Sequence, residues 1–363
     1  MRKSEEMLFA LLRASLHEQE TETNFFVNTT ETDWDECFKL AKKQGVMALA
    51  WDGVLRLPTP LHPDMELKLQ WGIKVERIER KYQRYCKVAH EITLLYKQHD
   101  IATLHLKGVG LSTLYPVPSH REGGDIDIYT YSASKNLSDQ EANALADTLI
   151  QQQGIEVEHH SYKHSNFFYK GIPVENHKIF LNVKDIKEAI QANEILFREL
   201  NPHCVELPAG KVQIPSPAFN TLFIAFHAMQ HYGSGIALHH LCDWAVILKQ
   251  YGLVIPKEME RLRFYQGIKA LIRLCNDYLG TNVPVEGGEA LANEMMQEIL
   301  HPKYNAVVPT KRKVGIILYK TRRLLHTHKL KSRVFDISLS RRIWSSIVIH
   351  IRKPQTIFGR NEK

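Results

Sequence analysis

Hydrophobic and polar positions recur at helical spacing over the first hundred residues of the chain. Residues 33–48 place four apolar side chains on one helical face: Trp34, Cys37, Leu40 and Ala41. Residues 64–98 form a long charged run that contains no glycine or proline after Gly72. The pattern predicts a helical N-terminal region over residues 1–98.

Beyond residue 100 the period changes from helical to alternating. Residues 101–107, IATLHLK, alternate apolar and polar side chains, and Gly108 ends the run. Residues 124–130, GDIDIYT, alternate in the same way, with Ile126 and Ile128 on the face that a core would cover. Both runs are predicted to be β-strands.

A helix and more strands are predicted to follow. Ser138 and Glu141 form a capping-box signature, and Gly154 ends the apolar helical spacing about four turns later. Three further runs have strand character: 155–160, 165–170 and 172–180. This order of elements predicts an α+β fold over residues 99–186, with a sheet that carries its helices on one side.

The remainder of the chain is predicted to be mainly helical. Ser216 followed by Pro217 is a typical helix start. The predicted helices of this region, which covers residues 187–305, are 217–232, 238–251, 259–279 and 291–300. Residues 306–363 form a separate basic tail.

Composition agrees with a globular protein of two or three packed units, since 363 residues are 44% apolar and 24% charged. The five cysteines are odd in number and lack a C-x-x-C pair, which argues against a disulfide framework or a zinc knuckle. The first residues lack the uninterrupted apolar core of a secretory signal, and no run of about 18 apolar residues occurs. We therefore expect a cytoplasmic protein.

The net charge of +7 is concentrated in the tail. Residues 311–363 carry 15 lysines and arginines against two acids, which leaves a net −6 over residues 1–310. The segment 341–353, RRIWSSIVIHIRK, is a basic amphipathic helix. Such a helix can contact an anionic membrane surface or a nucleic acid. We favour the simpler interpretation that its apolar side packs on the protein.

The two aspartates of GGDIDI are the first candidate site. Residues two apart on a strand share a face and lie about 7 Å apart, so the carboxylates of Asp125 and Asp127 can converge on one point. Two such carboxylates repel each other unless a cation lies between them, and Mg²⁺ prefers oxygen ligands together with substrate phosphates. The pattern suits phosphoryl or nucleotidyl transfer, and a solvated strand edge is the alternative.

A candidate phosphate-binding loop precedes these aspartates. In LHLKGVGLSTLY, a strand ends at Gly108, and Gly110 and Ser112 follow in a loop that leads into a short helix predicted over residues 111–115. Glycines let backbone N–H groups approach an anion, and the start of a helix favours negative charge. Lys107 and Arg121 are candidate phosphate ligands, and Arg121 is preferred because its planar fork can bind two oxygens.

The segments LKGVGLSTLYPVP and HREGGDIDIY together resemble the signature of the uncharacterised bacterial nucleotidyltransferases within the DNA polymerase β superfamily. DWDECFKLAKKQGV, VENHKIF and HHLCDWAVIL extend the resemblance over roughly residues 30–260. It implies a polymerase-β-like mixed sheet between helical N-terminal and C-terminal regions. Sixteen residues separate Gly108 from Asp125, and the Gly-Ser pair is spread over Gly108 to Ser112, which departs from the compact versions of the motif.

Carried over residue by residue, the resemblance makes Gly108 the turn glycine and Asp125 and Asp127 metal ligands. It implies that Glu175, in VENHKIF, is the third acid, with a further possible role as a general base. The three acids would hold two Mg²⁺ ions, and the activity would move an NMP from a nucleoside triphosphate to a hydroxyl acceptor and release pyrophosphate. The acceptor stays open among RNA, protein and small molecules.

Two other functions fit the same residues. The loosened Gly-Ser turn suits a non-catalytic nucleotide-binding or regulatory protein that keeps the fold. The carboxylates also suit a metal-dependent phosphohydrolase, which would consume a nucleoside triphosphate without an acceptor.

Several polar residues outside this motif have weaker patterns. His227 and His231 are spaced i, i+4 as zinc ligands are, but no third ligand can be identified, so a structural or substrate-facing role is favoured. His177 shares a strand face with Glu175 and is a candidate to line the same cleft. Asp243 is expected to be a paired structural aspartate. Three more histidines are expected at the surface: His159, His160 and His164.

Overall fold

The computed structural model describes residues 1–159, 161–182, 186–305, 307–352 and 357–358. The N-terminal region is helical, as predicted, and contains α1 (Lys3–His17), α2 (Glu31–Lys43), α3 (Met47–Leu55) and α4 (Met65–Lys97). The predicted helix 33–48 is divided between α2 and α3, because Gly45 has a φ of 65° that a continuing helix does not allow. Asp64 caps the long helix α4 by accepting a hydrogen bond from the Leu67 amide.

The central sheet is mixed and has six strands in the order β3-β4-β2-β1-β6-β5. Its strands are β1 (Ile101–His105), β2 (Ile126–Ser132), β3 (His164–Tyr169), β4 (Ile172–His177), β5 (His203–Leu207) and β6 (Gly210–Ile214). The pairs β2–β4 and β1–β6 are parallel, and β1–β2, β3–β4 and β5–β6 are antiparallel. The α+β class predicted from the sequence is confirmed.

Two details of the predicted sheet are wrong. The expected strand 155–160 contributes a single bridge, between Glu158 and Asn166, because it lies beyond the edge strand β3; residue 160 is outside the described residues. The hairpin β5–β6 lies where helices were expected. Only Leu207 of its strand β5 is buried, so the sequence lacks the apolar run that marks a buried strand.

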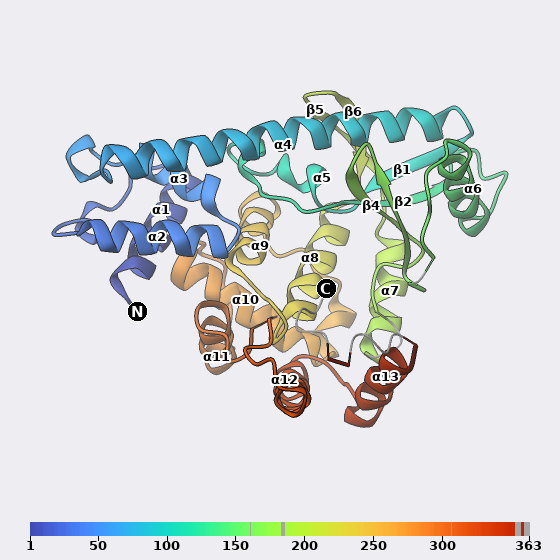
Figure 1. Cartoon of the computed structure of the whole chain (residues 1–363). Helices are drawn as coiled ribbons and strands as arrows, with labels where there is room; N and C mark the ends of the chain where they lie inside the picture. The colour runs from blue at the N-terminus through green and yellow to red at the C-terminus, as the bar shows by residue number, and fades with distance from the viewer. Residues whose placement is uncertain (160, 183–185, 306, 353–356, 359–363) are drawn as a thin grey trace.

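Helices α4 and α6 (Asp139–Gln152) pack against one face of the sheet, α4 on β1 and β6 and α6 on β2 and β4 (Figure 1). The capping box predicted at Ser138 and Glu141 starts α6. Ile126 and Ile128 point into this layer and are buried. The alternate residues of β2 therefore point to the opposite face, where Tyr129 contacts Phe180, which follows β4, and Phe197 of α7 (Glu188–Arg198).

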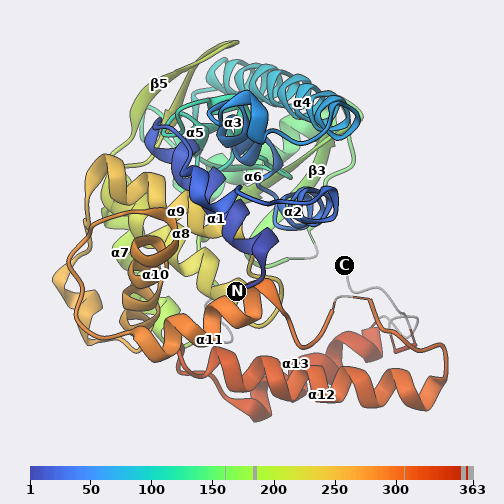
Figure 2. The same ribbon diagram turned by 90° about the vertical axis from the view of Figure 1, so that its left-hand side faces the viewer.

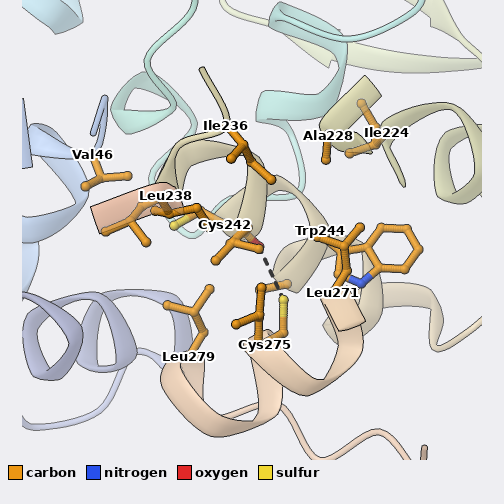
Figure 3. Packing of buried hydrophobic residues seen from close by; sticks show 14 of the residues in the cluster. Val46, Ile224, Ala228, Ile236, Leu238, Cys242, Trp244, Leu271, Cys275 and Leu279 are labelled. Carbon is orange, nitrogen blue, oxygen red and sulfur yellow. Dashed lines mark hydrogen bonds between the residues drawn. The ribbon is translucent and has the colours of Figure 1, made fainter. Parts of the chain in front are cut away.

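Helices α8 (Pro217–His231), α9 (Leu238–Tyr251), α10 (Phe264–Leu279) and α11 (Glu289–Leu300) form the larger part of the second half of the chain. The predicted limits of α8 and α9 are confirmed to within one or two residues. These helices share one hydrophobic cluster with α1, α2 and α3, and α1 contacts α10. Figure 3 shows the centre of this cluster, where Cys242 of α9 lies near Cys275 of α10 and the Cys275 thiol donates a weak hydrogen bond to the Leu241 carbonyl.

All five cysteines, each within the described residues, are free thiols, in agreement with the sequence analysis. Of the described helices, none combines the length and the apolar character needed to cross a membrane. The division into four regions stays a prediction, although the helices before and after the sheet pack into one core.

The basic tail forms α12 (Lys313–Lys331) and α13 (Leu339–Arg352), which extend along one side of the molecule (Figure 2). The interpretation that the apolar side of the last helix packs on the protein is wrong for the described side chains. Trp344 and Ile351 of α13 are 66% and 70% exposed, and Ile343 and Ile347 are also exposed. The side chains of α13 instead line a cavity together with those of α12.

Candidate active site

The parallel pairing of β2 and β4 builds the acidic site. Asp127 lies in register with Glu175, and Tyr129 with His177. Side chains in register on neighbouring strands point to the same face, so Asp127, Glu175 and His177 converge. One ligand atom of each lies within 4.8 Å of the others. The structure thus brings the predicted third acid beside the second aspartate.

Asp127 is held from two sides. Nε2 of His177 lies 3.0 Å from its Oδ1 and 3.5 Å from Glu175 Oε2. Because an ionised carboxylate only accepts, His177 Nε2 carries the hydrogen and donates it to Asp127. The ammonium of Lys107 lies 3.0 Å from Asp127 Oδ2 and 3.7 Å from Asp125 Oδ2. Asp127 is almost fully buried, whereas 36% of the Asp125 side chain is exposed.

The pKa values of the acids separate accordingly. Burial acts to raise the pKa of Asp127, but Lys107 and the hydrogen bond from His177 outweigh it and hold the pKa below its usual range. For Asp125, burial and the neighbouring Asp127 charge raise the pKa, and Lys107 only partly offsets them. Burial opposes the charge of Glu175, yet its contact with His177 leaves the pKa lowered. The site is therefore a focus of negative charge balanced by Lys107.

Gly108 forms the turn from β1 toward α5 (Val109–Ser112), which is shorter than the predicted helix over residues 111–115. Its φ of 60° and ψ of −123° suit glycine, and an added Cβ would lie 3.3 Å from the Asp125 carbonyl oxygen. The turn therefore lets the loop pass directly against the aspartate strand. A cavity between this turn and α4 is lined by residues that include Gly108, Val109, Ser112, Arg121 and Asp125.

The other two residues of the predicted phosphate-binding loop, Gly110 and Ser112, have packing roles as well. Gly110 does not line the cavity; a Cβ there would come within 2.6 Å of Ile214 Cγ2 on β6. Ser112 does line it, but the buried hydroxyl donates to the Val109 carbonyl at 2.6 Å and lies 3.1 Å from the Tyr82 hydroxyl. The backbone turn at Gly108, rather than the Ser112 hydroxyl, is therefore the part of the predicted phosphate-binding loop that a ligand can contact.

Arg121 is bound to the helical region. Its Nε and one terminal nitrogen donate to the two carboxylate oxygens of Asp243 on α9, each at 2.8 Å. The Tyr115 hydroxyl donates to the same carboxylate at 2.5 Å. Asp243 is thus the paired structural aspartate that was expected. The two Arg121 nitrogens that were expected to bind phosphate oxygens donate to Asp243 instead. Arg121 still lines the cavity beside Asp125.

Sequence reasoning missed two groups at this site. Tyr85 and Lys81 of α4 line the cavity, and their side chains donate to the Gly124 and Gly123 carbonyls at 2.9 and 2.6 Å. Their spacing on α4 matched a solvated helix face, so no local signal marked them. Lys163, which is partly exposed, is a further cation at the site; desolvation lowers its pKa although the charge of Asp127 acts in the opposite direction.

Among the histidines expected at the surface, His159 is 48% exposed and His160 lies outside the described residues. His164 was placed wrongly. Its side chain is only 16% exposed, and its Nε2 lies 3.7 Å from Glu175 Oε2, because β3 pairs with β4 and brings His164 opposite His177.

Comparison with known families agrees with the geometry. The family model described as uncharacterised nucleotidyltransferase matches residues 30–280. The chain belongs to this uncharacterised nucleotidyltransferase family. The match supports nucleotidyl transfer as the general activity, and it spans the acidic site, the Gly108 turn and α8 to α9. Comparisons with curated proteins and with solved structures found no match.

The carboxylate oxygens at this site suit a hard divalent cation. Asp125, Asp127 and Glu175 offer carboxylate oxygens on one face of the sheet. Asp127 Oδ2 is buried and accepts no hydrogen bond of regular geometry from the described residues, so a cation is its natural partner. In the structure, the Lys107 ammonium supplies that positive charge.

Proposed function

We propose that the protein is a Mg²⁺-dependent nucleotidyltransferase with a polymerase-β-like fold, which moves an NMP from a nucleoside triphosphate to a hydroxyl acceptor and releases pyrophosphate. The observation that carries the proposal is the register of Asp127 with Glu175 on neighbouring strands. Asp125, two residues before Asp127, lines the cavity next to the Gly108 turn. Family membership supports the same class of reaction.

Asp125, Asp127 and Glu175 would hold two Mg²⁺ ions, which when bound activate the acceptor hydroxyl and neutralise charge on the triphosphate. His177 acts through Asp127: its Nε2–H fixes the carboxylate in place at 3.0 Å. Glu175 is 28% exposed, so it can also reach an acceptor and take its proton. The acids therefore combine cation binding with a route for the acceptor proton.

In this proposal the triphosphate binds beside the Gly108 turn. The cavity there lies between α4 and the loop 108–125, and Asp125 lies at its border with the acidic site. Lys107 is buried against the two aspartates, and these neighbours outweigh burial and raise its pKa, so it carries a full charge. Once cations balance the aspartates, this ammonium is available to phosphate oxygens. The aromatic walls of Tyr82 and Tyr85 provide apolar surface for the nucleoside.

The acceptor is a hydroxyl group on an RNA, a protein or a small molecule. The exposed basic and apolar side chains of α12 and α13 add a possible contact with a nucleic acid or an anionic membrane surface. One cavity is lined both by Lys163, whose charge interacts with the acidic site, and by Lys331 of α12 and Arg342 of α13.

Thermal unfolding with Mg²⁺ and each of the nucleoside triphosphates tests the proposal. Binding to the native state raises the melting temperature, so one or more triphosphates should stabilise the wild-type protein only when Mg²⁺ is present. Asp125→Asn should abolish the shift. Asp35→Asn, at an exposed helix position, is the control and should keep it. A full panel without any shift in the wild-type protein would contradict the proposal.

A non-catalytic nucleotide-binding or regulatory protein is the second candidate. It is favoured by one observation: Lys107 lies between Asp125 and Asp127, where it already balances both carboxylates. In that case nucleotides would shift the melting temperature, but no label would pass from the triphosphate to an acceptor. A phosphohydrolase would instead release phosphate from the triphosphate without any acceptor.

A further inference from the structure

A second group of possible ligands lies outside the acidic site. His227 and His231 follow one another by one turn near the end of α8, and His240 comes from the first turn of α9. The two helices pack against each other in Figure 1. The third histidine is thirteen and nine residues away in sequence, so only the fold brings it to the i, i+4 pair. One ligand nitrogen of each ring lies within 4.8 Å of the other two.

The rings have the spacing of a metal site. Their centroids are 4.7 Å (His227–His231), 5.4 Å (His227–His240) and 4.8 Å (His231–His240) apart. Three imidazoles bound to one tetrahedral zinc ion have centroids about 5 Å apart, given Zn–N bonds of about 2.0–2.1 Å. In an ordinary histidine cluster, hydrogen bonds to neighbouring groups explain the arrangement. Among the described residues, the ring nitrogens of His227 and His231 have no hydrogen bond to a protein group, and both side chains are partly exposed.

His240 has the outer contact that orients a ligand. Its Nδ1 accepts a hydrogen bond from the Ala237 amide at 3.1 Å and lies 3.3 Å from the Ala237 carbonyl oxygen. A histidine that binds metal through Nε2 carries its hydrogen on Nδ1, so zinc binding requires Nδ1 to donate to the carbonyl instead of accepting from the amide. Burial is also the main cause that lowers the pKa of all three rings, that of His231 to about 4.

We propose that His227, His231 and His240 bind a divalent transition metal of the zinc class, at a site separate from the carboxylates. Imidazole nitrogens suit zinc and its neighbours in the series, whereas Mg²⁺ prefers oxygen, so the two sites select different ions. Three protein ligands leave a fourth position. His231 lines a cavity with Lys163 and Lys331, so this fourth position is accessible to water or to an anionic group of a ligand. The ion also links α8 to α9.

The test uses the full chain and zinc alone. Purified protein is stripped with chelator, titrated with Zn²⁺ and, separately, with Co²⁺, and then analysed for bound metal after gel filtration. The proposal expects about one tightly bound ion per chain and the absorption of tetrahedral Co²⁺. His227→Ala and His231→Ala should each weaken zinc binding by more than the roughly 10- to 100-fold that loss of an outer-shell partner costs.

Two control variants distinguish zinc held by these three histidines from zinc held by the acidic cluster or by a surface histidine. Asp127→Asn, in the acidic cluster, should retain the zinc, and so should His99→Ala, at an exposed histidine outside both clusters. Far-UV circular dichroism of the metal-free variants shows whether they fold, and His227→Gln offers a second, bulkier replacement if an alanine variant does not. The proposal is wrong if the wild-type chain retains no zinc, or if folded His227 and His231 variants bind it as tightly as the wild type.

Discussion

The Lys107 ammonium lies 3.0 Å from Asp127 Oδ2, inside the acidic site and not at its edge. Lys107 is 13% exposed and the Asp127 side chain 1% exposed, so water screens their attraction only weakly. This ion pair offsets part of the repulsion between the carboxylates of Asp125 and Asp127 on this face of the sheet. It also means that a divalent ion must share the site with, or displace, a built-in positive charge.

Replacing Lys107 should therefore change cation and nucleotide binding in opposite directions. In Lys107→Gln the competing ammonium is removed, so affinity for Mn²⁺, measured by calorimetry without nucleotide, should rise by about tenfold or more, equivalent to about 1.4 kcal/mol. Affinity for the triphosphate should fall, because a phosphate ligand is lost. Lys170→Gln, at an exposed pair with Glu91, is the control. Unchanged Mn²⁺ affinity would show that Lys107 does not occupy the position of a cation.

His177 is expected to position Asp127. In His177→Ala the Oδ1 atom of Asp127 loses its donor, and Mn²⁺ affinity should fall about 10- to 100-fold. His177→Gln keeps a side-chain donor and should recover part of the loss, which a purely structural role would not predict. His203→Ala, on β5 at the far edge of the sheet, serves as the control. Equal affinities for the alanine and glutamine variants would argue against a positioning role.

Local sequence patterns predicted the helices that begin with a recognisable capping residue. Ser138 and Glu141 marked the start of α6, and Ser216 and Pro217 that of α8, because a cap is made within four residues. The position of a strand in the sheet, in contrast, depends on residues that are distant in the sequence. Residues 155–160 alternate like a strand, but Glu158 makes only a single bridge to the edge strand, and β5 forms a ladder although only one of its side chains is buried.

The candidate site shows the same limit. Asp125 and Asp127 were identified from their spacing, and Glu175 from a resemblance, yet the Asp127–Glu175 contact depends on the parallel register of β2 and β4. Arg121 was expected to bind phosphate, but its bidentate partner Asp243 lies 122 residues away. No pattern within one segment could have indicated that ion pair.

The buried pair of Arg121 and Asp243 should be important for stability. Asp243→Asn leaves a guanidinium, 9% exposed, without its carboxylate, and should lower the free energy of unfolding by about 3–5 kcal/mol. Urea denaturation measures the loss. The exposed pair of Arg198 and Glu258 offers a matched control, since solvent screens it and Glu258→Gln should cost much less than Asp243→Asn. An Asp243→Asn cost as small as that of the control would contradict the account.

His120 should make stability depend on pH. Its Nδ1 lies 2.8 Å from Asp52 of α3 and its Nε2 2.9 Å from Glu79 of α4. Burial opposes the charged ring, but the two carboxylates outweigh it and raise the pKa above 6.5. Because the pKa of His120 is raised in the folded state, the charged ring stabilises the folded protein fully at pH values below the unfolded-state pKa. This stabilisation is lost as the pH rises through the folded-state pKa.

Urea denaturation at a series of pH values from about 6 to about 9 tests this expectation. The free energy of unfolding should decrease across the raised pKa of His120 in the wild-type protein. His120→Gln should flatten this part of the profile, and His99→Gln, at an exposed histidine, should leave it unchanged. A wild-type profile that rises with pH in this interval would have the wrong sign.

Transfer of label from a nucleoside triphosphate tests the central claim most directly. The wild-type protein, Mg²⁺ and a cell extract are incubated with each triphosphate labelled at the α-phosphate, and in parallel at the γ-phosphate. The account predicts that the α-label becomes attached to an acceptor while the γ-label leaves as pyrophosphate. Asp127→Asn should lower the transfer by at least about 10³-fold, since it removes a ligand whose cations supply several kcal/mol of charge stabilisation. Transfer that is absent for all triphosphates, or that persists unchanged in Asp127→Asn, would contradict it.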